Sequence, residues 1–199
     1  AGNVHRHRIV DEPAAVERIH ARAVTMEMVV GENLPPEPPA DERDRTVAGV
    51  DANANGVRDD VELEIHRRHA DFAKIRAAQL QYAMALQSQL TDVFSEKTLV
   101  AALQESGRGT SCIRSTHKID DGLLPNKPAH EWTREELDRG NKLGKQHDEI
   151  VEPLIKEVED LVLNSDDRKL AHEQTYDYMT SYALSTQSNC DIDLQTLPN

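Results

Sequence analysis

The clearest evidence for the fold class of this chain is the segment of residues 59–103, DDVELEIHRRHADFAKIRAAQLQYAMALQSQLTDVFSEKTLVAAL. Its apolar side chains recur every three or four positions, the period of an amphipathic α-helix. These residues are Val61, Ile65, Phe72, Ile75, Tyr82, Leu86, Leu90 and Val93. We therefore predict a helix from Asp59 to about Leu103, and we expect other helices to pack against it, because a long helix is stabilised mainly by burying its apolar face.

The residues before this segment predict a shorter helix and an extended connector. Asp11-Glu12-Pro13 is typical of a helix start, since Asp caps free amide groups and Pro fits the first turn. A helical stripe then follows, ending at Gly31; its members are Ile19, Ala23, Met26 and Val30. Four prolines between Leu34 and Ala40 remove amide donors and favour extended backbone. We therefore expect a stiff connector there.

The residues after this segment predict a loop and two further helices. Ser106-Gly107-Arg108-Gly109 indicates a helix end, followed by an irregular loop up to Pro128 that carries Cys112. Thr133 and Glu136 form a capping box before a long helix. Ser165 precedes a last helix, in which one face carries Leu170, Gln174, Tyr178 and Tyr182. No sustained alternation typical of strands is present, so we predict an all-α bundle of about four helices.

The composition argues against several classes of protein. The 199 residues include 36 acidic and 23 basic side chains, which give a formal net charge of −13. Such a charge repels phosphate, so we expect no nucleic-acid or anionic-membrane partner. Hydrophobic residues make up 38%, which is compatible with a globular core rather than with disorder. No apolar run approaches the roughly 20 residues that cross a bilayer, so we expect no transmembrane segment.

One short segment has the spacing of oxygen ligands that is typical of a cation-binding loop. Residues 51–62, DANANGVRDDVE, match the pattern D-x-[DN]-x-[DN]-G-x5-E at every specified position. Calcium takes six to eight oxygen ligands, and a tightly coiled loop aims alternate side chains at one point, with a glycine at its sharp turn. Here Gly56 occupies the turn. The predicted calcium ligands are the side chains of Asp51, Asn53, Asn55, Asp59 and Glu62 and the carbonyl of Val57. The alternative is a metal-free Asn/Gly turn before an acid-capped helix.

This loop resembles the EF-hand calcium loop, and in particular the variants in which an extended approach replaces the entering helix. Together with the Pro-rich stretch before it, it looks like a feature of uncharacterised secreted or periplasmic bacterial proteins. The resemblance covers about residues 34–65 and implies calcium binding and a secreted or periplasmic location, but no reaction. On this basis we divide the chain into an N-terminal arm and helix (1–33), a Pro-rich connector (34–50), and a calcium loop with a helical domain (51–199).

Two departures from the EF-hand pattern favour a structural ion over a calcium sensor. The eighth loop position, usually apolar and paired with a second loop, is Arg58. The other acidic runs, at residues 164–167 and 191–193, lack the glycine and the final glutamate of a second loop. An opening pair of loops is therefore not expected. With at most three anionic ligands we expect modest affinity, between about micromolar and millimolar.

Cys112 and Cys190 lie far apart and outside any CxxC arrangement. A single disulfide is the simplest use of the pair, and a calcium motif also favours an oxidising compartment. Loop-closure entropy gives such a disulfide an upper stabilisation of about 4.5 kcal/mol. Two buried free thiols are the alternative.

The function predicted from these observations is a calcium-binding helical protein that acts as a binding or assembly module, with a protein partner or self-association. We place no catalytic residue, because no family signature surrounds Cys112, Ser111, His117 or His130. The first alternative is an enzyme with an iron, zinc or copper centre, built from Glu17, His20, His66, His69 or His147. The second alternative is a subunit of a polymer or surface layer. His5 and His7 make a metal-capable N-terminus, but two histidines in a terminal arm are more typical of disorder.

Overall fold

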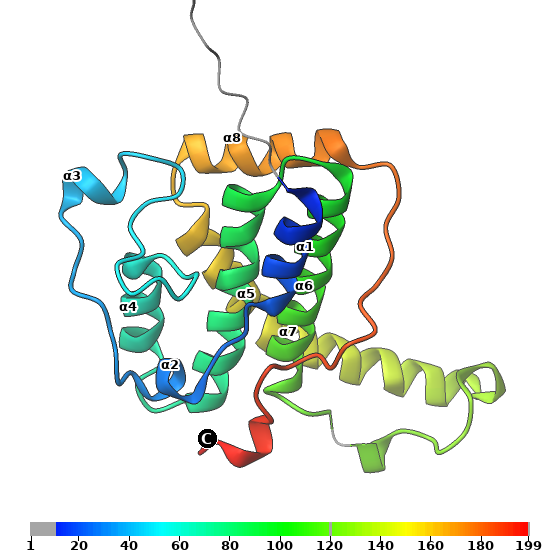
Figure 1. The fold of residues 1–199 in the computed structure, drawn as a ribbon. Helices are drawn as coiled ribbons and strands as arrows, with labels where there is room; N and C mark the ends of the chain where they lie inside the picture. Colours follow the sequence, from blue (N-terminus) through cyan, green and yellow to red (C-terminus); the bar gives the residue numbers. More distant parts are fainter. Residues whose placement is uncertain (1–10, 120, 199) are drawn as a thin grey trace, which may run out of the picture.

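A computed structural model describes residues 11–119 and 121–198, and its fold is shown in Figure 1. The described residues form eight α-helices and no β-strand, so the all-α prediction is confirmed, with more helices than the four or so expected. The helices are α1 (Glu12–Ala21), α2 (Met26–Val30), α3 (Ala40–Arg43), α4 (Asp59–Arg68), α5 (Ala73–Asp92), α6 (Glu96–Ser115), α7 (Arg134–Val162) and α8 (Asp166–Thr175). Four 3₁₀ segments lie at Asp121–Leu123, Ala129–Glu131, Tyr176–Tyr178 and Leu194–Thr196.

Helix α5 is the centre of the fold. It packs against α1, α2, α4, α6, α7 and α8, and in Figure 1 these helices surround it. Every residue from Ala77 to Gln89 is buried. A helix that is covered on all sides needs no apolar stripe, and α5 accordingly mixes alanine with glutamine around its whole circumference.

The glutamines of α5 connect it to four other parts of the chain. The side-chain amides of Gln79, Gln81, Gln87 and Gln89 each donate a hydrogen bond, because a buried amide without a partner would cost stability. The acceptors are the Leu154 carbonyl of α7, the Asn189 carbonyl near the C-terminus, the Ala48 carbonyl before the predicted calcium loop and Ser106 Oγ of α6, at 2.6–3.0 Å. The central helix therefore fixes both the C-terminal segment and the approach to the loop.

The predicted continuous helix from Asp59 to about Leu103 is wrong: this stretch contains α4, α5 and the first part of α6. The first break follows α4, where Arg76 donates to the carbonyls of His69 and Ala70 and so satisfies groups that a continuing helix would have bonded. The second break precedes Ser95, which forms a capping box with Thr98. Both breaks let the three helices pack side by side.

The predicted helix end at Gly107 and Gly109 is also wrong. Helix α6 runs through both glycines to Ser115, so Cys112 is helical and the irregular segment begins only after it. A Cβ on Gly109 would lie 2.8 Å from the Cα of Tyr82 in α5, closer than such atoms approach. This glycine therefore allows α5 and α6 to touch rather than ending a helix.

Three shorter elements also differ from the prediction. The stripe up to Gly31 is divided between α1 and α2, where Thr25 caps the second helix, and Gly31 ends it at φ 77°. The connector contains α3, which starts directly after Pro39. Helix α8 ends at Thr175, so Tyr178 and Tyr182 do not share its face. The caps at Asp11, at Thr133 with Glu136, and at Ser165 are confirmed.

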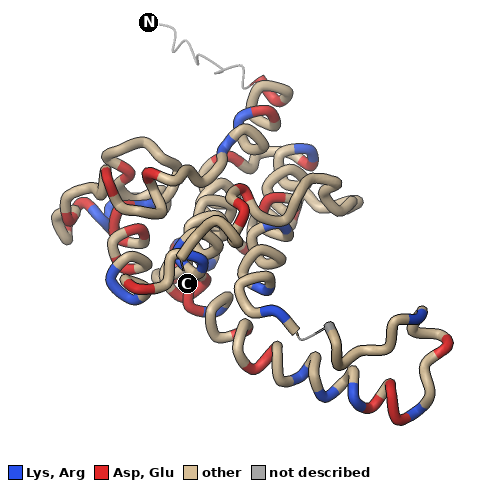
Figure 2. The backbone as a smooth tube through the Cα atoms, turned by 90° about the horizontal axis from the view of Figure 1, so that it is seen from below, with Lys and Arg blue, Asp and Glu red and all other residues tan. Residues whose placement is uncertain are grey.

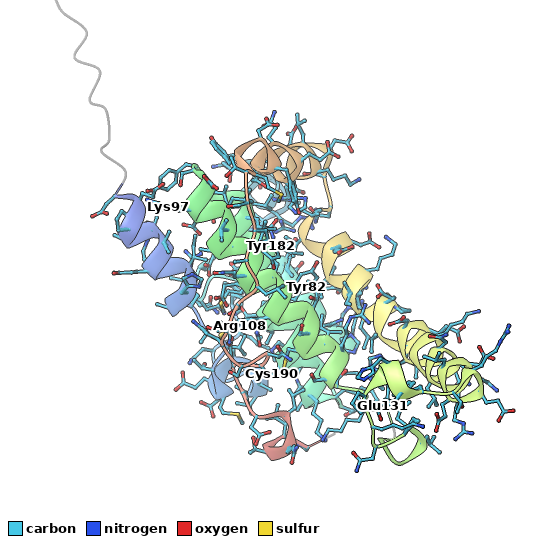
Figure 3. All side chains as sticks on the ribbon, turned by 90° about the vertical axis from the view of Figure 1, so that its right-hand side faces the viewer. Tyr82, Lys97, Arg108, Glu131, Tyr182 and Cys190 are labelled. Atoms are coloured by element: carbon cyan, nitrogen blue, oxygen red, sulfur yellow. A yellow bond between two sulfur atoms is a disulfide. The ribbon has the colours of Figure 1, made fainter. Side chains whose placement is uncertain are left out.

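The C-terminal segment is tied to α6. Cys112 and Cys190 form a disulfide, which confirms the predicted pairing, and Figure 3 shows Cys190 close to Arg108. Arg108 donates to the Ser188 carbonyl at 2.7 Å and pairs with Asp191 at 2.7 Å. Asp191 in turn accepts the amide of Val24 at 3.0 Å. These bonds join the end of the chain to the segment between α1 and α2.

The first half of α7 projects from the helical body. Its buried residues begin only at Val151, and Figure 2 shows Lys, Arg, Asp and Glu mixed along the projecting half. Trp132 packs over Gly140 near the outer, N-terminal end of this half, and its indole nitrogen donates to the Lys127 carbonyl at 2.8 Å. In the part of the chain that the structure describes, no helix is both long and apolar enough to span a bilayer.

Gly109→Ala will destabilise the protein by about 1–3 kcal/mol, because the added methyl group overlaps the backbone of Tyr82. Gly144→Ala is the matched control in α7, where nothing lies within 4 Å of the added group, and it will stabilise by about 0.5–1 kcal/mol through helix propensity. Urea denaturation of both variants checks the pair. Equal effects of the two substitutions would contradict the close approach of α5 to α6.

Reduction of the disulfide will lower the midpoint of thermal unfolding, because Cys112 and Cys190 are 78 residues apart in sequence. The loss is at most about 4.5 kcal/mol by loop-closure entropy. Melts of the oxidised protein, of the reduced protein and of the Cys112→Ser/Cys190→Ser variant measure it. The double variant should melt like the reduced protein and should not respond to reductant.

Candidate metal centre

Residues 51–58 form a coiled loop that leads directly into α4. The amide of Asp59 donates to the Val50 carbonyl at 2.9 Å, so the two ends of the loop meet. The Asp51 carboxylate accepts the amides of Asn55 at 3.1 Å and Gly56 at 2.9 Å. Gly56 has a φ of 87°, a left-handed conformation that favours glycine. The loop is therefore wound around the carboxylate of its first residue.

Three of the predicted ligand side chains meet inside this loop. Asn53 Nδ2 and Asn55 Nδ2 both donate to Glu62 Oε2, at 3.2 and 2.9 Å. Asn53 Nδ2 also donates to the Asn33 carbonyl at 3.1 Å. Each amide carries an oxygen on the same carbon, so a rotation about its last torsion exchanges a donor for an oxygen ligand. The separations of 3.2 and 2.9 Å join an amide nitrogen to the carboxylate, so both amides must turn before their oxygens face a cation at this point.

Two other predicted ligands are held at the edge of this group. Both oxygens of the Asp59 carboxylate face the amide of Ala52, at 3.0 and 3.2 Å, and Asp59 is buried. The amide of Val57 donates to Asn55 Oδ1 at 2.9 Å, and its side chain packs in the hydrophobic core. Carboxylate and amide oxygens keep a second lone pair beside such a bond. Asp59 and Val57 therefore lie beside the place where the side chains of Asn53, Asn55 and Glu62 meet, which we call the convergent point of the loop.

The carboxylates of the loop lack a cationic partner. Among the described residues, no Lys, Arg or His nitrogen lies within 4.0 Å of Asp51, Asp59 or Glu62. Burial raises the pKa of Glu62; the amides of Asn55 and Asn53 oppose that shift, and the charges of Asp59 and Asp51 add to it. Burial also raises the pKa of Asp59, against the Ala52 amide. Buried carboxylates without a counter-charge are costly, so this loop is electrostatically suited to a cation.

Arg58, the departure at the eighth loop position, is one of the most deeply buried side chains in the molecule. Its guanidinium pairs with Asp60 at 2.5 Å and donates to the carbonyls of Leu161 and Val162 at 2.9 and 3.1 Å. These are free carbonyls at the C-terminal end of α7, where a cation is favoured. Its position beside Gly49 leaves no room for a side chain on that glycine. The sequence did not predict this anchor.

A second buried arginine, Arg168 in α8, holds the approach to the loop. Its side chain is almost fully covered, and its guanidinium donates hydrogen bonds mainly to residues of the connector. The acceptors are the carbonyls of Arg43, Thr46 and Val47, Asp44 Oδ1 and Asn164 Oδ1, at 2.6–3.3 Å. The Arg168 guanidinium holds the pKa of Asp44 below its usual value. The connector is therefore fixed to the turn between α7 and α8.

The histidines of the alternative transition-metal centre each have a separate partner. His20 bonds Glu105, His66 the Met28 carbonyl, His69 the Glu157 carboxylate, and His147 the carbonyls of Arg114 and His117. Within residues 11–119 and 121–198, no three His, Cys, Asp or Glu side chains converge enough to hold a metal by themselves. A cation in the loop would therefore need amide and carbonyl oxygens in addition to carboxylates. His5 and His7 lie outside the described residues.

Comparisons with protein families, with curated proteins and with solved structures found no match for this chain. A functional assignment therefore depends on the geometry and charge of the loop. Cys112 is not available as a nucleophile, because it forms the disulfide.

Without calcium, Glu62→Gln will stabilise the protein by about 1 kcal/mol at neutral pH, because it removes a buried charge and keeps an acceptor for Asn55. Folding raises the pKa of Glu62 above its unfolded value of 4.5. The Glu62 charge therefore destabilises the fold fully at a pH above the folded-state pKa, and it costs nothing at a pH below the unfolded value, where the carboxyl is protonated in both states. The gain should therefore vanish as the pH falls below about 4. Melts in EGTA across this range measure it.

Glu64→Gln is the matched control on the same helix. Arg67 and Arg68 lower the pKa of Glu64 to about 2, so its charge stabilises the fold at neutral pH. Its substitution should destabilise by about 0.5 kcal/mol, since these pairs are largely exposed. The same sign of effect at positions 62 and 64 would contradict the electrostatics described for the loop.

Proposed function

We propose that residues 51–62 bind one calcium ion and that the ion has a structural role in a secreted or periplasmic binding or assembly module. The observation that carries this proposal is the set of three buried or partly buried carboxylates, Asp51, Asp59 and Glu62, without a cationic side chain beside them. Their oxygens and those of two asparagines belong to a loop with the complete calcium spacing. A divalent cation supplies the missing charge.

Calcium fits this donor set better than the transition metals do. The donors are carboxylate, amide and carbonyl oxygens, which suit hard cations, and no histidine or cysteine takes part. Magnesium prefers a regular octahedron and keeps several waters, whereas a loop that offers six oxygens at flexible positions suits calcium. A loop with three carboxylates and two neutral amides supports modest affinity, which extracellular calcium would saturate.

The proposed structural role follows from what surrounds the loop. Arg58 attaches its last turn to α7, Gln87 of α5 holds the Ala48 carbonyl, and Arg168 holds the connector. The ion would lock together segments that these bonds already bring near. A disulfide and a calcium loop in one chain favour an oxidising, calcium-rich compartment. The module would bind a protein partner or a second copy of itself through surfaces outside the loop.

Calcium will raise the thermal midpoint of the wild-type protein. At a free concentration about 100 times the Kd, mass action stabilises the folded state by about 2.7 kcal/mol. For a domain of this size this is a shift of about 5–10 °C. Scanning calorimetry in calcium and in EGTA measures it, and titration calorimetry gives the stoichiometry, expected to be one ion per chain.

Glu62→Gln should abolish most of this shift, because it removes the carboxylate at the convergent point of the loop. Glu64→Gln should keep it, because Glu64 faces Arg67 and Arg68 instead. A calcium shift that survives Glu62→Gln, or no shift in the wild type at millimolar calcium, would rule out the proposed site.

A further inference from the structure

Asn55 is the only asparagine in the sequence that is followed by glycine. The backbone nitrogen after an asparagine can attack the carbon of the side-chain amide, and glycine hinders this approach least because it has no Cβ. The attack closes a five-membered succinimide ring and expels ammonia, and hydrolysis of the ring leaves an acidic residue. Asn55 and Gly56 therefore meet the covalent requirements for deamidation.

A carboxylate lies at the nitrogen that must lose its proton in this reaction. The Gly56 amide donates to Asp51 Oδ2 at 2.9 Å. This separation lies within the range of about 2.6–3.2 Å over which a side chain acts as a general base. The other oxygen of the same carboxylate accepts the Asn55 amide at 3.1 Å, so two bonds fix its position. A proton removed from Gly56 therefore has an acceptor already in contact with it.

The side-chain amide of Asn55 is held at both of its polar atoms. Its Oδ1 accepts the Val57 amide at 2.9 Å, and its Nδ2 donates to Glu62 Oε2 at 2.9 Å. Attack on the carbon between these two atoms places negative charge on Oδ1. A backbone amide at this distance is the group that stabilises such an oxyanion. The loop therefore supplies a base for the attacking nitrogen and a donor for the oxygen that becomes charged.

Water has access to the reacting group. Asn55 is half-buried, and it lines a cavity of about 250 Å³ together with Glu62. At roughly 30 Å³ per water, the cavity has room for about eight water molecules. Ammonia can leave through this space, and water can enter it to open the ring.

We propose that Asn55 is a self-deamidation site, in which Asp51 takes the proton of the Gly56 amide while that nitrogen bonds to Asn55 Cγ. The Cγ–Nδ2 bond then breaks, and Nδ2 leaves as ammonia with the proton that Asp51 held, relayed by water. A second water adds to one ring carbonyl, leaving its hydroxyl on that carbon and its proton on the ring nitrogen. Addition at Cγ gives aspartate, and addition at the backbone carbon gives isoaspartate. No ion takes part, so this inference does not depend on the proposed calcium site.

The reaction changes the loop irreversibly. The Nδ2 group that donates to Glu62 is replaced by a carboxylate oxygen, so two negative charges face each other in place of a hydrogen bond. Isoaspartate also lengthens the backbone by one carbon directly before Gly56. The site therefore acts as a timer that weakens the metal-free loop as the protein ages.

Incubation of the full chain in EGTA at neutral pH, followed by tryptic peptide mapping, measures the reaction. Residues 46–58 form one tryptic peptide, in which Asn55 should be converted and Asn53, followed by alanine, should not. The Asn55→Asp chain provides the elution standard for the aspartate product. Asp51→Asn keeps an oxygen for the backbone amides but removes the base, and it should slow the conversion at least about tenfold.

Asp41→Asn is the matched control, since it removes the same charge from an exposed side chain in α3, and it should leave the rate unchanged. Unfolding of the wild type in urea separates Asp51 from Gly56 without a substitution, and it should also slow the conversion. Equal rates in Asp51→Asn and Asp41→Asn, or a faster conversion in urea than in the folded protein, would overturn this inference. Neither outcome bears on the calcium site, whose own test is the thermal shift in calcium.

Discussion

Helix α5 is buried on every side, and six other helices are packed around it. On a fully covered helix the side-chain nitrogens of the four buried glutamines all donate within the protein, whereas the side-chain oxygens of Gln79, Gln87 and Gln89 have no partner. The glutamines of α5 therefore define where α6, α7, the C-terminal segment and the residue before the loop can lie. Gln87 bonds the Ala48 carbonyl, only three residues before Asp51. This bond links the central helix directly to the residues that lead into the candidate metal centre.

The two buried arginines and the loop carboxylates differ in whether the protein provides partners of opposite charge for them. Arg58 and Arg168 are almost fully covered, yet both are surrounded by carbonyls and carboxylates that satisfy their donors. Glu62 is equally covered and receives only neutral amide donors. A chain that supplies partners for its arginines but no cation for Glu62 has concentrated an unbalanced negative charge at one place. An external cation is the simplest species that would balance it.

Local signals in the sequence were sufficient to predict the helical class and several helix starts, because a cap depends on residues three positions apart, as at Thr133 with Glu136. The predicted disulfide was confirmed as well. The breaks after α4 and before α6 were missed, since a regular apolar period continues through Phe72 and Val93. Gly109 was interpreted as a helix end, although its role is a contact with Tyr82. The predicted ligands Asn53, Asn55 and Glu62 do lie together, but the depth of Arg58 depends on α7, about 100 residues away, and no local pattern encodes it.

Arg58 attaches residues 51–58 to another part of the helical body. In paired EF-hand loops an apolar residue at the eighth position contacts the partner loop, and that position here carries a guanidinium bonded to the last carbonyls of α7. In this chain the eighth loop position is therefore attached to the C-terminal end of α7. Arg58 directly precedes Asp59 and lies four residues before Glu62, so an ion on these carboxylates would tighten the attachment of the loop to α7. Because this attachment is already made, binding would rigidify the existing arrangement of helices rather than open it.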